Sequence, residues 1–238
     1  MTPHALLAWD GSIAVWINHF VGRSPTFDLF IAWLLKAHVT RFLPLILAMC
    51  WLWFQPHVRQ RERRQVLLEA LVLSFVALFL ARGLALMLPF RERPLANVDL
   101  ALTVPQAVDT GLRTWSSFPS DHAVLAFMLA LSLWRVSRPV GVWALFHAMV
   151  FICLPRLYVG FHYASDVIAG ALLGTALALA APLLKLGRVL TAFLLRLEST
   201  RPAAVYSFGF FVLFEIAEMF DSVRLVAVQT FKLLRHAV

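Results

Sequence analysis

Two short stretches of the chain combine histidine with residues that can bind phosphate. Residues 118–122 read Phe-Pro-Ser-Asp-His, and residues 156–166 place an arginine, a histidine and an aspartate in the spacing Arg-x5-His-x3-Asp. Each stretch borders a long apolar run. An apolar membrane segment tolerates Arg, His and Asp only where they face a polar cavity or one another. Together the two stretches predict a catalytic centre at a membrane surface.

In the second stretch, His162 and Asp166 are four residues apart, a spacing that puts both on one face of a helix. The carboxylate is then expected to accept a hydrogen bond from one imidazole nitrogen, leaving the other as a nucleophile or base. Arg156 adds a planar fork of donors that matches phosphate oxygens. A structural hydrogen bond is the alternative for His and Asp alone, and Arg156 argues against it.

The first stretch has the composition of a helix start. Ser120 is well placed as an N-cap, and the free N–H groups that follow it form an anion site. Pro119 and Asp121 are also typical of ordinary helix initiation, but that does not explain a histidine at the start of a membrane span. We therefore predict that His122 is a general acid for a leaving oxygen. Arg93, after the preceding apolar run, is expected to complete a cationic clamp on phosphate.

Composition places these motifs in a membrane protein. The chain has 238 residues, of which 61% are hydrophobic and 14% charged, whereas a soluble domain is roughly half apolar and a quarter charged. We predict an all-α, polytopic membrane bundle with about six transmembrane helices plus interfacial helices. The net charge of +8 fits positive-inside topology and anionic headgroups. No basic run is interleaved with aromatics, which argues against nucleic acid as a partner. Cys50 and Cys153 lie in apolar runs and are interpreted as buried hydrophobes.

The apolar runs define the elements that must hold the motifs. One integral membrane domain is expected over 1–238, with a catalytic core over 25–186 and an additional span and interfacial helix over 187–238. The predicted spans are 41–54, 66–88, 121–134, 140–155, 166–184 and 203–220, and the predicted interfacial segments are 5–36, 185–201 and 222–236. The acidic residues of the last span are interpreted as lying at a membrane exit, solvated or paired with Arg224; they are Glu215, Glu218 and Asp221.

Basic residues set the expected orientation. The loops 55–65, 135–139 and 185–201 hold four, two and four Lys or Arg, which predicts that they are cytoplasmic. They alternate with the loops that carry the two motifs, 89–120 and 156–165. Both motifs are therefore expected on the opposite face, which is the periplasmic face in a bacterial inner membrane.

These ordered motifs resemble the signature of the type 2 phosphatidic acid phosphatase (PAP2) superfamily, membrane lipid phosphatases related in fold to vanadium haloperoxidases. That signature reads Lys-x6-Arg-Pro, then Pro-Ser-Gly-His, then Ser-Arg-x5-His-x3-Asp. Arg93-Pro94 ends the first part here, residues 119–122 form the second, and residues 155–166 form the third. The resemblance covers roughly residues 25–186. Within the superfamily, the chain is similar to the bacterial undecaprenyl pyrophosphate phosphatases of this fold.

The chain departs from the family pattern at three positions. The family lysine falls at Leu86, which cannot bind phosphate, and Arg82, one helical turn earlier, is expected to replace it. Asp121 stands where the family has glycine, and Pro155 stands where it has serine.

The resemblance implies hydrolysis of a lipid phosphomonoester or pyrophosphate through a phosphohistidine. His162 would be the nucleophile, Asp166 would orient it, and His122 would be the general acid. The implied phosphate-binding residues are Arg93, Arg156, Ser120, Arg82 and Asp121. No metal and no cofactor are expected, because cationic side chains supply the charge.

The expected partners are a lipid phosphate drawn from the bilayer and the membrane lipids themselves, with no obligate protein partner. A lipid-to-lipid phosphotransferase using the same phosphohistidine is an alternative, since only the acceptor differs. A non-catalytic scaffold or transporter is a third reading, which the intact histidines, Arg156 and Asp166 disfavour.

Overall fold

A computed structural model describes residues 3–105, 108, 115–184, 186–223 and 229, and within these ranges the chain is helical and has no strands. The predicted all-α class is confirmed. The helices are α1 (Pro3–Asn18), α2 (Pro25–Lys36), α3 (His38–Arg41), α4 (Leu43–Phe54), α5 (Gln60–Met87), α6 (Asp121–Val136), α7 (Arg138–His147), α8 (Leu154–Tyr158), α9 (Ala164–Ala180), α10 (Leu186–Thr200) and α11 (Pro202–Ala217). A π-helical turn, Ala148–Cys153, joins α7 to α8.

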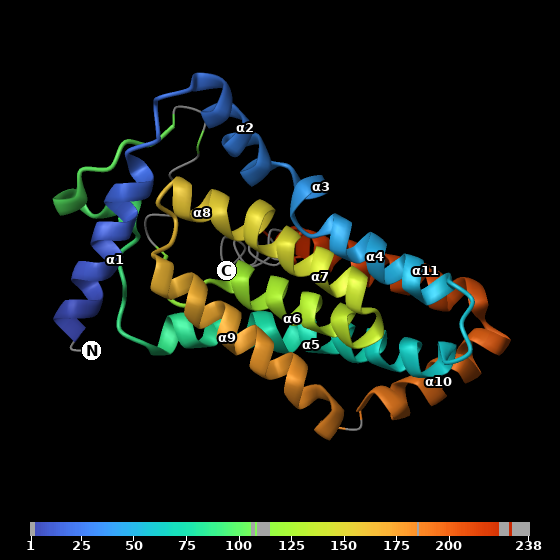
Figure 1. The fold of residues 1–238 in the computed structure, drawn as a ribbon. Helices are drawn as coiled ribbons and strands as arrows, with labels where there is room; N and C mark the ends of the chain where they lie inside the picture. The colour runs from blue at the N-terminus through green and yellow to red at the C-terminus, as the bar shows by residue number, and fades with distance from the viewer. Residues whose placement is uncertain (1–2, 106–107, 109–114, 185, 224–228, 230–238) are drawn as a thin grey trace, which may run out of the picture.

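Helix α6 is the central element of the bundle (Figure 1) and packs against α5, α7 and α9. Its apolar side chains are buried all around rather than along one stripe, as expected for a helix in the middle of a bundle. They include Val124, Leu125, Met128, Leu129 and Leu133, each fully buried. Because α6 begins at Asp121, this packing carries His122 into the interior of the protein.

Two glycines allow α9 to lie directly against α6. A Cβ atom on Gly174 would be 2.2 Å from the carbonyl oxygen of Val124, and one on Gly170 would be 2.5 Å from that of Ser120. No larger residue fits at such distances. The Gly-x3-Gly spacing is a common device for close packing of membrane helices. The contact places the start of α9, with Asp166, beside the start of α6.

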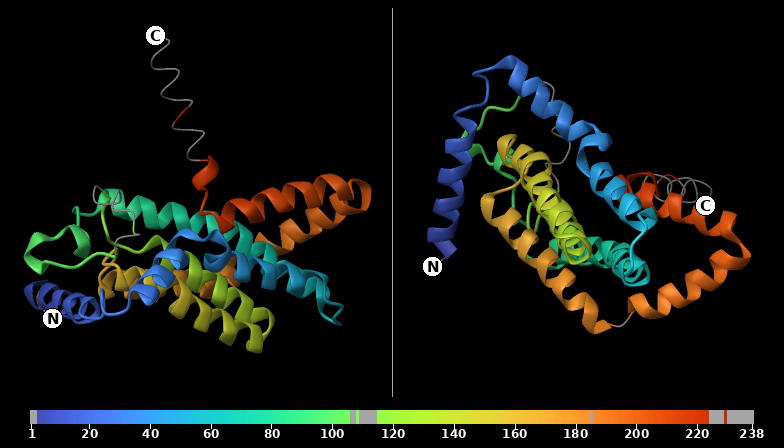
Figure 2. Two further views of the ribbon diagram at one scale, coloured as in Figure 1. Left: turned by 90° about the horizontal axis from the view of Figure 1, so that it is seen from above. Right: turned by 45° about the vertical axis from the view of Figure 1, so that its right-hand side comes forward.

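The two histidine motifs lie at one end of the bundle. Helices α5 and α8 end there, and α6 and α9 begin there (Figures 1 and 2). The segments that join α4 to α5 and α6 to α7 are at the other end. The arrangement brings the loops that carry the motifs together, as the alternation of basic loops predicted.

Three helical segments are long and apolar enough to cross a membrane by length and composition: Gln60–Met87, Arg138–Tyr158 and Ala164–Leu183. Leu43–Phe54 and Pro202–Ala217 are shorter apolar helices. The total of about six spans stays a prediction.

The predicted loop over 55–65 is wrong for its second half, because α5 begins at Gln60. Arg, Glu and Gln are good helix formers, so the basic run extends the helix outward beyond its apolar part. Hydropathy marked where the apolar segment begins, not where the helix begins.

The segments expected at the interface form helices where the structure describes them. Helix α1 packs against α8 and α9, α2 packs against α8, and α10 packs against α5 and α11. Figure 1 shows α1 crosswise to α5 and α6 at the end of the bundle that carries the motifs. The interfacial helix expected over 222–236 lies mostly outside the described residues.

Candidate active site

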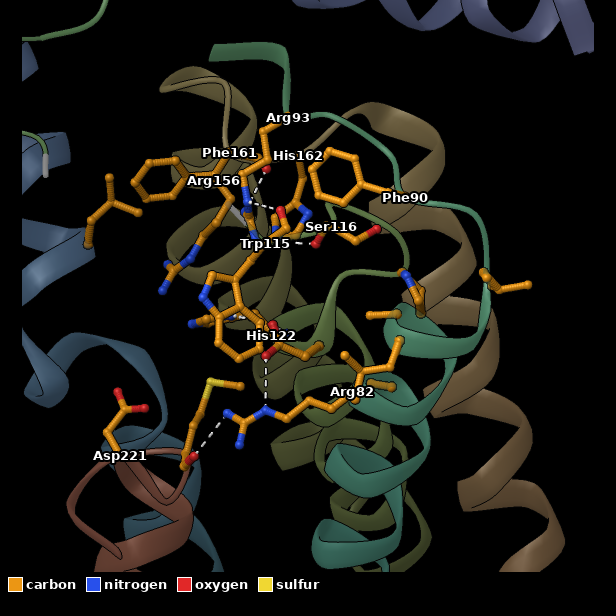
Figure 3. Close-up of a pocket in the computed structure, with 18 of the residues that line it drawn as sticks. Arg82, Phe90, Arg93, Trp115, Ser116, His122, Arg156, Phe161, His162 and Asp221 are labelled. Atoms are coloured by element: carbon orange, nitrogen blue, oxygen red, sulfur yellow. Dashed lines mark hydrogen bonds and ion pairs between the residues drawn. The ribbon is translucent and has the colours of Figure 1, made fainter. Parts of the chain in front are cut away.

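His122 and His162 line the same cavity, which has a volume of about 600 Å³ (Figure 3). The sequence places these residues 40 positions apart, and the close contact between α6 and α9 brings them together. The charged side chains that line the cavity with them are Arg41, Arg82, Arg93, Asp121, Arg156 and Asp221. Four arginines and two histidines around one space form a site for an anion.

His162 is held by a backbone carbonyl. Its Nδ1 lies 2.8 Å from the oxygen of Ser117, and its side chain is 5% exposed. A carbonyl oxygen only accepts, so Nδ1 carries a proton, and in the neutral ring Nε2 is the unprotonated nitrogen. The neutral ring is therefore in the tautomer that a nucleophilic Nε2 requires.

Asp166 does not make the hydrogen bond expected with His162. Its nearer oxygen, Oδ2, is 3.7 Å from Nδ1, beyond hydrogen-bond length. That oxygen instead accepts from the backbone N–H of Tyr163 at 2.7 Å. The prediction that Asp166 fixes the tautomer directly is wrong, because Ser117 already occupies Nδ1. Asp166 lies close enough to the ring for its charge to be felt there, and its side chain holds the start of α9.

The other oxygen of Asp166 binds Arg91. Arg91 Nη1 is 2.5 Å from Asp166 Oδ1, and the guanidinium lies over the ring of Tyr163, 4.3 Å from its centroid. Arg91 also donates to the hydroxyl of Ser165 at 2.8 Å. Arg91 is not among the residues that line the cavity. It therefore contacts Ser165 and Asp166 from outside the cavity.

His122 is oriented by its neighbour Asp121. Asp121 Oδ1 is 2.9 Å from His122 Nδ1 and accepts from the backbone N–H of His122 at 2.8 Å. This geometry directs Nδ1–H toward the carboxylate, so Nε2 is the atom available for proton transfer. The residue that replaces the family glycine thus acts on the presumed general acid.

Asp121 also pairs with Arg82, whose Nε lies 3.7 Å from Asp121 Oδ2. Arg82 Nη2 donates to the carbonyl of Met219 at 3.2 Å. The expectation that Asp121 binds phosphate is corrected by these contacts, since a carboxylate repels phosphate and this one already pairs with Arg82 and His122. Arg82 does line the cavity, as its proposed role requires.

Arg93 and Arg156 are both nearly fully buried, with exposed fractions of 7% and 3%. Arg93 donates to the carbonyls of Phe161 and Trp115 at 2.8 and 3.2 Å. Arg156 donates to the carbonyl of Ile152 at 2.9 Å. Neutral carbonyls fix the guanidinium planes without cancelling their charge, which leaves that charge for an anion in the cavity.

Burial and nearby carboxylates have opposite effects on the pKa of Arg93. Burial lowers the pKa of Arg93 below its ordinary value, while the carboxylates of Asp121 and Asp166 raise it. A guanidinium remains protonated in proteins.

The side chain of Ser120 does not reach the cavity, where the predicted phosphate-binding role requires it. Ser120 precedes α6 as expected, but its side chain makes no capping hydrogen bond, is 2% exposed and does not line the cavity. Its backbone N–H donates to the carbonyl of Asp166 at 3.2 Å. Ser120 therefore links α6 to α9, and the prediction that its hydroxyl binds phosphate is corrected.

Sequence reasoning missed two charged residues of the cavity. Arg41 was interpreted only as the start of a span, and Asp221 as an acidic residue at a membrane exit. Both line the cavity. Arg224, the partner expected for the acidic group, is outside the described residues. An arginine at the start of an apolar run was the available signal for Arg41.

One edge of the cavity is apolar and exposed. Leu86, Leu88 and Phe90 line it with exposed fractions of 80%, 39% and 62%. Leu86, at the position of the family lysine, thus belongs to an apolar rim and not to the charged floor. Among the residues that the structure describes, no group of three or more His, Cys, Asp or Glu side chains is arranged to hold a metal ion.

A helical membrane bundle with two histidines among arginines in one cavity is an arrangement suited to phosphoryl transfer. The family model described as the PAP2 superfamily matches residues 27–189, and the chain belongs to this superfamily. It is a membrane lipid phosphatase, a hydrolase of phosphoester or diphosphate bonds, as the resemblance implied.

Two similar proteins were found. The bacitracin transport permease protein BcrC of Bacillus licheniformis is 28% identical over 150 residues, which cover 63% of this chain and 68% of BcrC. The crystal structure of LpxE from Aquifex aeolicus is similar with a TM-score of 0.46 and 22% identity, over 71% of this chain and 92% of LpxE.

Proposed function

We propose that the protein hydrolyses a lipid phosphate or lipid diphosphate through a phosphohistidine at His162. The observation that carries the proposal is the single cavity that His162 and His122 share with Arg93 and Arg156. An anion held by the two arginines would lie between a nucleophilic nitrogen and a proton donor, which is the arrangement that in-line phosphoryl transfer requires.

The proposed reaction has two steps. In the first, Nε2 of His162 forms a bond to phosphorus, the phosphorus–oxygen bond to the lipid moiety breaks, and His122 gives a proton to the departing oxygen. In the second, His122 takes a proton from water, whose oxygen attacks phosphorus and breaks the nitrogen–phosphorus bond. Arg93 and Arg156 stabilise the charge on the equatorial oxygens in both steps.

The apolar rim supports a substrate whose tail stays in the bilayer. Leu86, Leu88 and Phe90 can contact hydrocarbon while the phosphate enters the charged part of the cavity. The orientation of the basic loops supports a bacterial inner membrane protein with the cavity on the periplasmic side. Polyprenyl diphosphate is the first substrate to test, followed by phosphatidic acid.

Two other functions remain as candidates. A lipid hydroxyl in place of water would make the same site a phosphotransferase. Transport is a candidate because the name of the Bacillus licheniformis relative refers to bacitracin transport. The test must therefore measure both released phosphate and the fate of the lipid.

The experiment uses the purified full-length protein in detergent with a panel of lipid phosphates and diphosphates. We expect release of inorganic phosphate, loss of release in His162→Ala, and a phosphoenzyme that is labile in acid and stable in base. Transfer of phosphate to an added lipid alcohol without release would favour the transferase. Bacitracin movement across proteoliposomes in His162→Ala, with no phosphate release by the wild type, would favour transport.

A further inference from the structure

Asp10 is a fully buried carboxylate that the proposed mechanism does not use. It lies on α1, outside the segment 27–189 that matches the family. In the sequence it only interrupts the first apolar stretch. A buried carboxylate is costly unless it is paired and hydrogen-bonded, so its partners indicate what it does.

All the partners of Asp10 belong to the loop that holds the nucleophile or to its support. Asp10 Oδ2 is 2.5 Å from Arg91 Nη2. Asp10 Oδ1 accepts from the backbone N–H of Ser165 at 3.0 Å, and the hydroxyl of Ser165 donates to Oδ2. Helix α1, which lies outside the family core, is thus hydrogen-bonded to the first turn of α9 at Ser165, three residues after His162.

Arg91 connects Asp10 to the nucleophile. Its two terminal nitrogens are divided between two carboxylates, Nη2 on Asp10 and Nη1 on Asp166, each at 2.5 Å. The second oxygen of Asp166 is 3.7 Å from His162 Nδ1. One guanidinium between two buried carboxylates leaves this group of three with a net charge of minus one, and its member Asp166 lies beside the ring.

We propose that Asp10 is a positioning residue for His162. Asp10 shares Arg91 with Asp166, so that part of the negative charge of Asp166 remains next to the imidazole. This inference rests on the proposed function, since it requires His162 to be the nucleophile. Without the charge of Asp10, Arg91 would neutralise Asp166 entirely.

The charge matters during the first step. When Nε2 of His162 bonds to phosphorus, its lone pair enters the new bond and the ring, which keeps the Nδ1 proton, becomes cationic. The phosphorus–oxygen bond breaks as this charge develops. A negative charge 3.7 Å from Nδ1 stabilises the cation in a buried site with a low effective dielectric.

The test is Asp10→Asn in the full chain, compared with Asp28→Asn. Asp28 is the matched control because it also ties the N-terminal helices to the core, by accepting from the Tyr158 hydroxyl at 2.5 Å, but has no contact with Arg91 or the cavity. We expect kcat to fall about tenfold in Asp10→Asn, with KM within about twofold and slower phosphoenzyme formation. Asp28→Asn should keep kcat, and Asp10→Glu should restore most of it.

An unchanged kcat in Asp10→Asn overturns the inference, as does an equal loss in Asp28→Asn, which would indicate general loosening. If Asp10→Asn does not fold, Ser165→Ala replaces it, since it removes the hydroxyl that contacts both Asp10 and Arg91. We then expect kcat about threefold lower at unchanged KM, and no loss would contradict the inference. Phosphate release that persists in His162→Ala would instead contradict the proposed function itself.

Discussion

The carboxylate of Asp166 lies 3.7 Å from Nδ1 of His162, while the carbonyl of Ser117 accepts the Nδ1 proton at 2.8 Å. The two tasks that a catalytic carboxylate usually combines are separated here. Ser117 sets the tautomer, and Asp166 supplies charge and holds the start of α9. The site therefore depends on a backbone group that no side-chain substitution can remove.

This separation predicts a limited effect of Asp166→Asn. The tautomer should persist, so kcat should fall about 10- to 100-fold through lost charge, less than the roughly 10⁴-fold loss seen where the carboxylate also sets the tautomer. The measurement is steady-state phosphate release beside His162→Ala. An Asp166→Asn variant as inactive as His162→Ala would show that Ser117 does not hold the ring unaided.

Arg93 and Arg156 should be needed for the transition state more than for folding. We expect either alanine variant to lose about 10²–10³-fold in kcat/KM, because each removes a fixed cationic donor from the developing charge. Arg93→Lys should recover little, since an ammonium cannot reproduce the fork that binds two carbonyls and an anion together. Recovery of wild-type kcat/KM in the lysine variant would indicate that only net charge matters.

Replacing Asp121 by the glycine typical of the family should separate binding from proton transfer. Asp121→Gly removes a negative charge from the cavity and releases Arg82, so inorganic phosphate should inhibit more strongly, by about three- to tenfold. The kcat should fall, because His122 loses the carboxylate that orients its ring. Inhibition constants and kcat measured on the same preparation check both effects. Weaker phosphate inhibition in Asp121→Gly would argue against a role for Arg82 in anion binding.

Gly174 should be required for the contact between α6 and α9. A Cβ there would meet the backbone of Val124 at 2.2 Å, so Gly174→Ala should cost about 1–3 kcal/mol through overpacking. It should also lower kcat/KM, because α6 and α9 each carry one histidine motif. Gly209→Ala is the control, since a Cβ at Gly209 meets nothing within 4 Å and alanine favours a helix. Thermal unfolding in detergent compares the two, and equal unfolding temperatures would refute the packing argument.

The cationic cavity is expected to work without a metal ion. Phosphate release should be unchanged after treatment with EDTA, because arginine side chains provide the positive charge at the equatorial oxygens. Loss of activity in EDTA and its return with added Mg²⁺ would contradict this prediction.

The sequence predicted the parts of the site that depend on local spacing. Hydropathy located the apolar helices. The helix face expected to carry both His162 and Asp166 was wrong, because α9 begins at Ala164, after His162, and only Asp166 lies in the helix. What the sequence could not supply were contacts between distant segments. Arg91 meets Asp10 and Asp166 across 81 and 75 residues, and no local pattern encodes such a pairing.

The errors at Ser120 and Asp121 have a common cause. The helix-start argument predicts anion binding at Ser120, and the place of Asp121 in the family motif predicts the same for that residue. The structure instead uses the backbone of Ser120 to join α6 to α9, and the carboxylate of Asp121 to hold His122. Residue type described what each side chain can do, whereas the packing of α9 against α6 decided which partner was within reach.

The apolar rim formed by Leu86, Leu88 and Phe90 has a consequence for the end of the proposed reaction. The dephosphorylated lipid and inorganic phosphate differ sharply in solubility, and the cavity borders both phases. The lipid product would partition into the bilayer and the phosphate into water, where dilution prevents their recombination. Removal of the lipid product into the membrane would thereby shift the equilibrium toward hydrolysis.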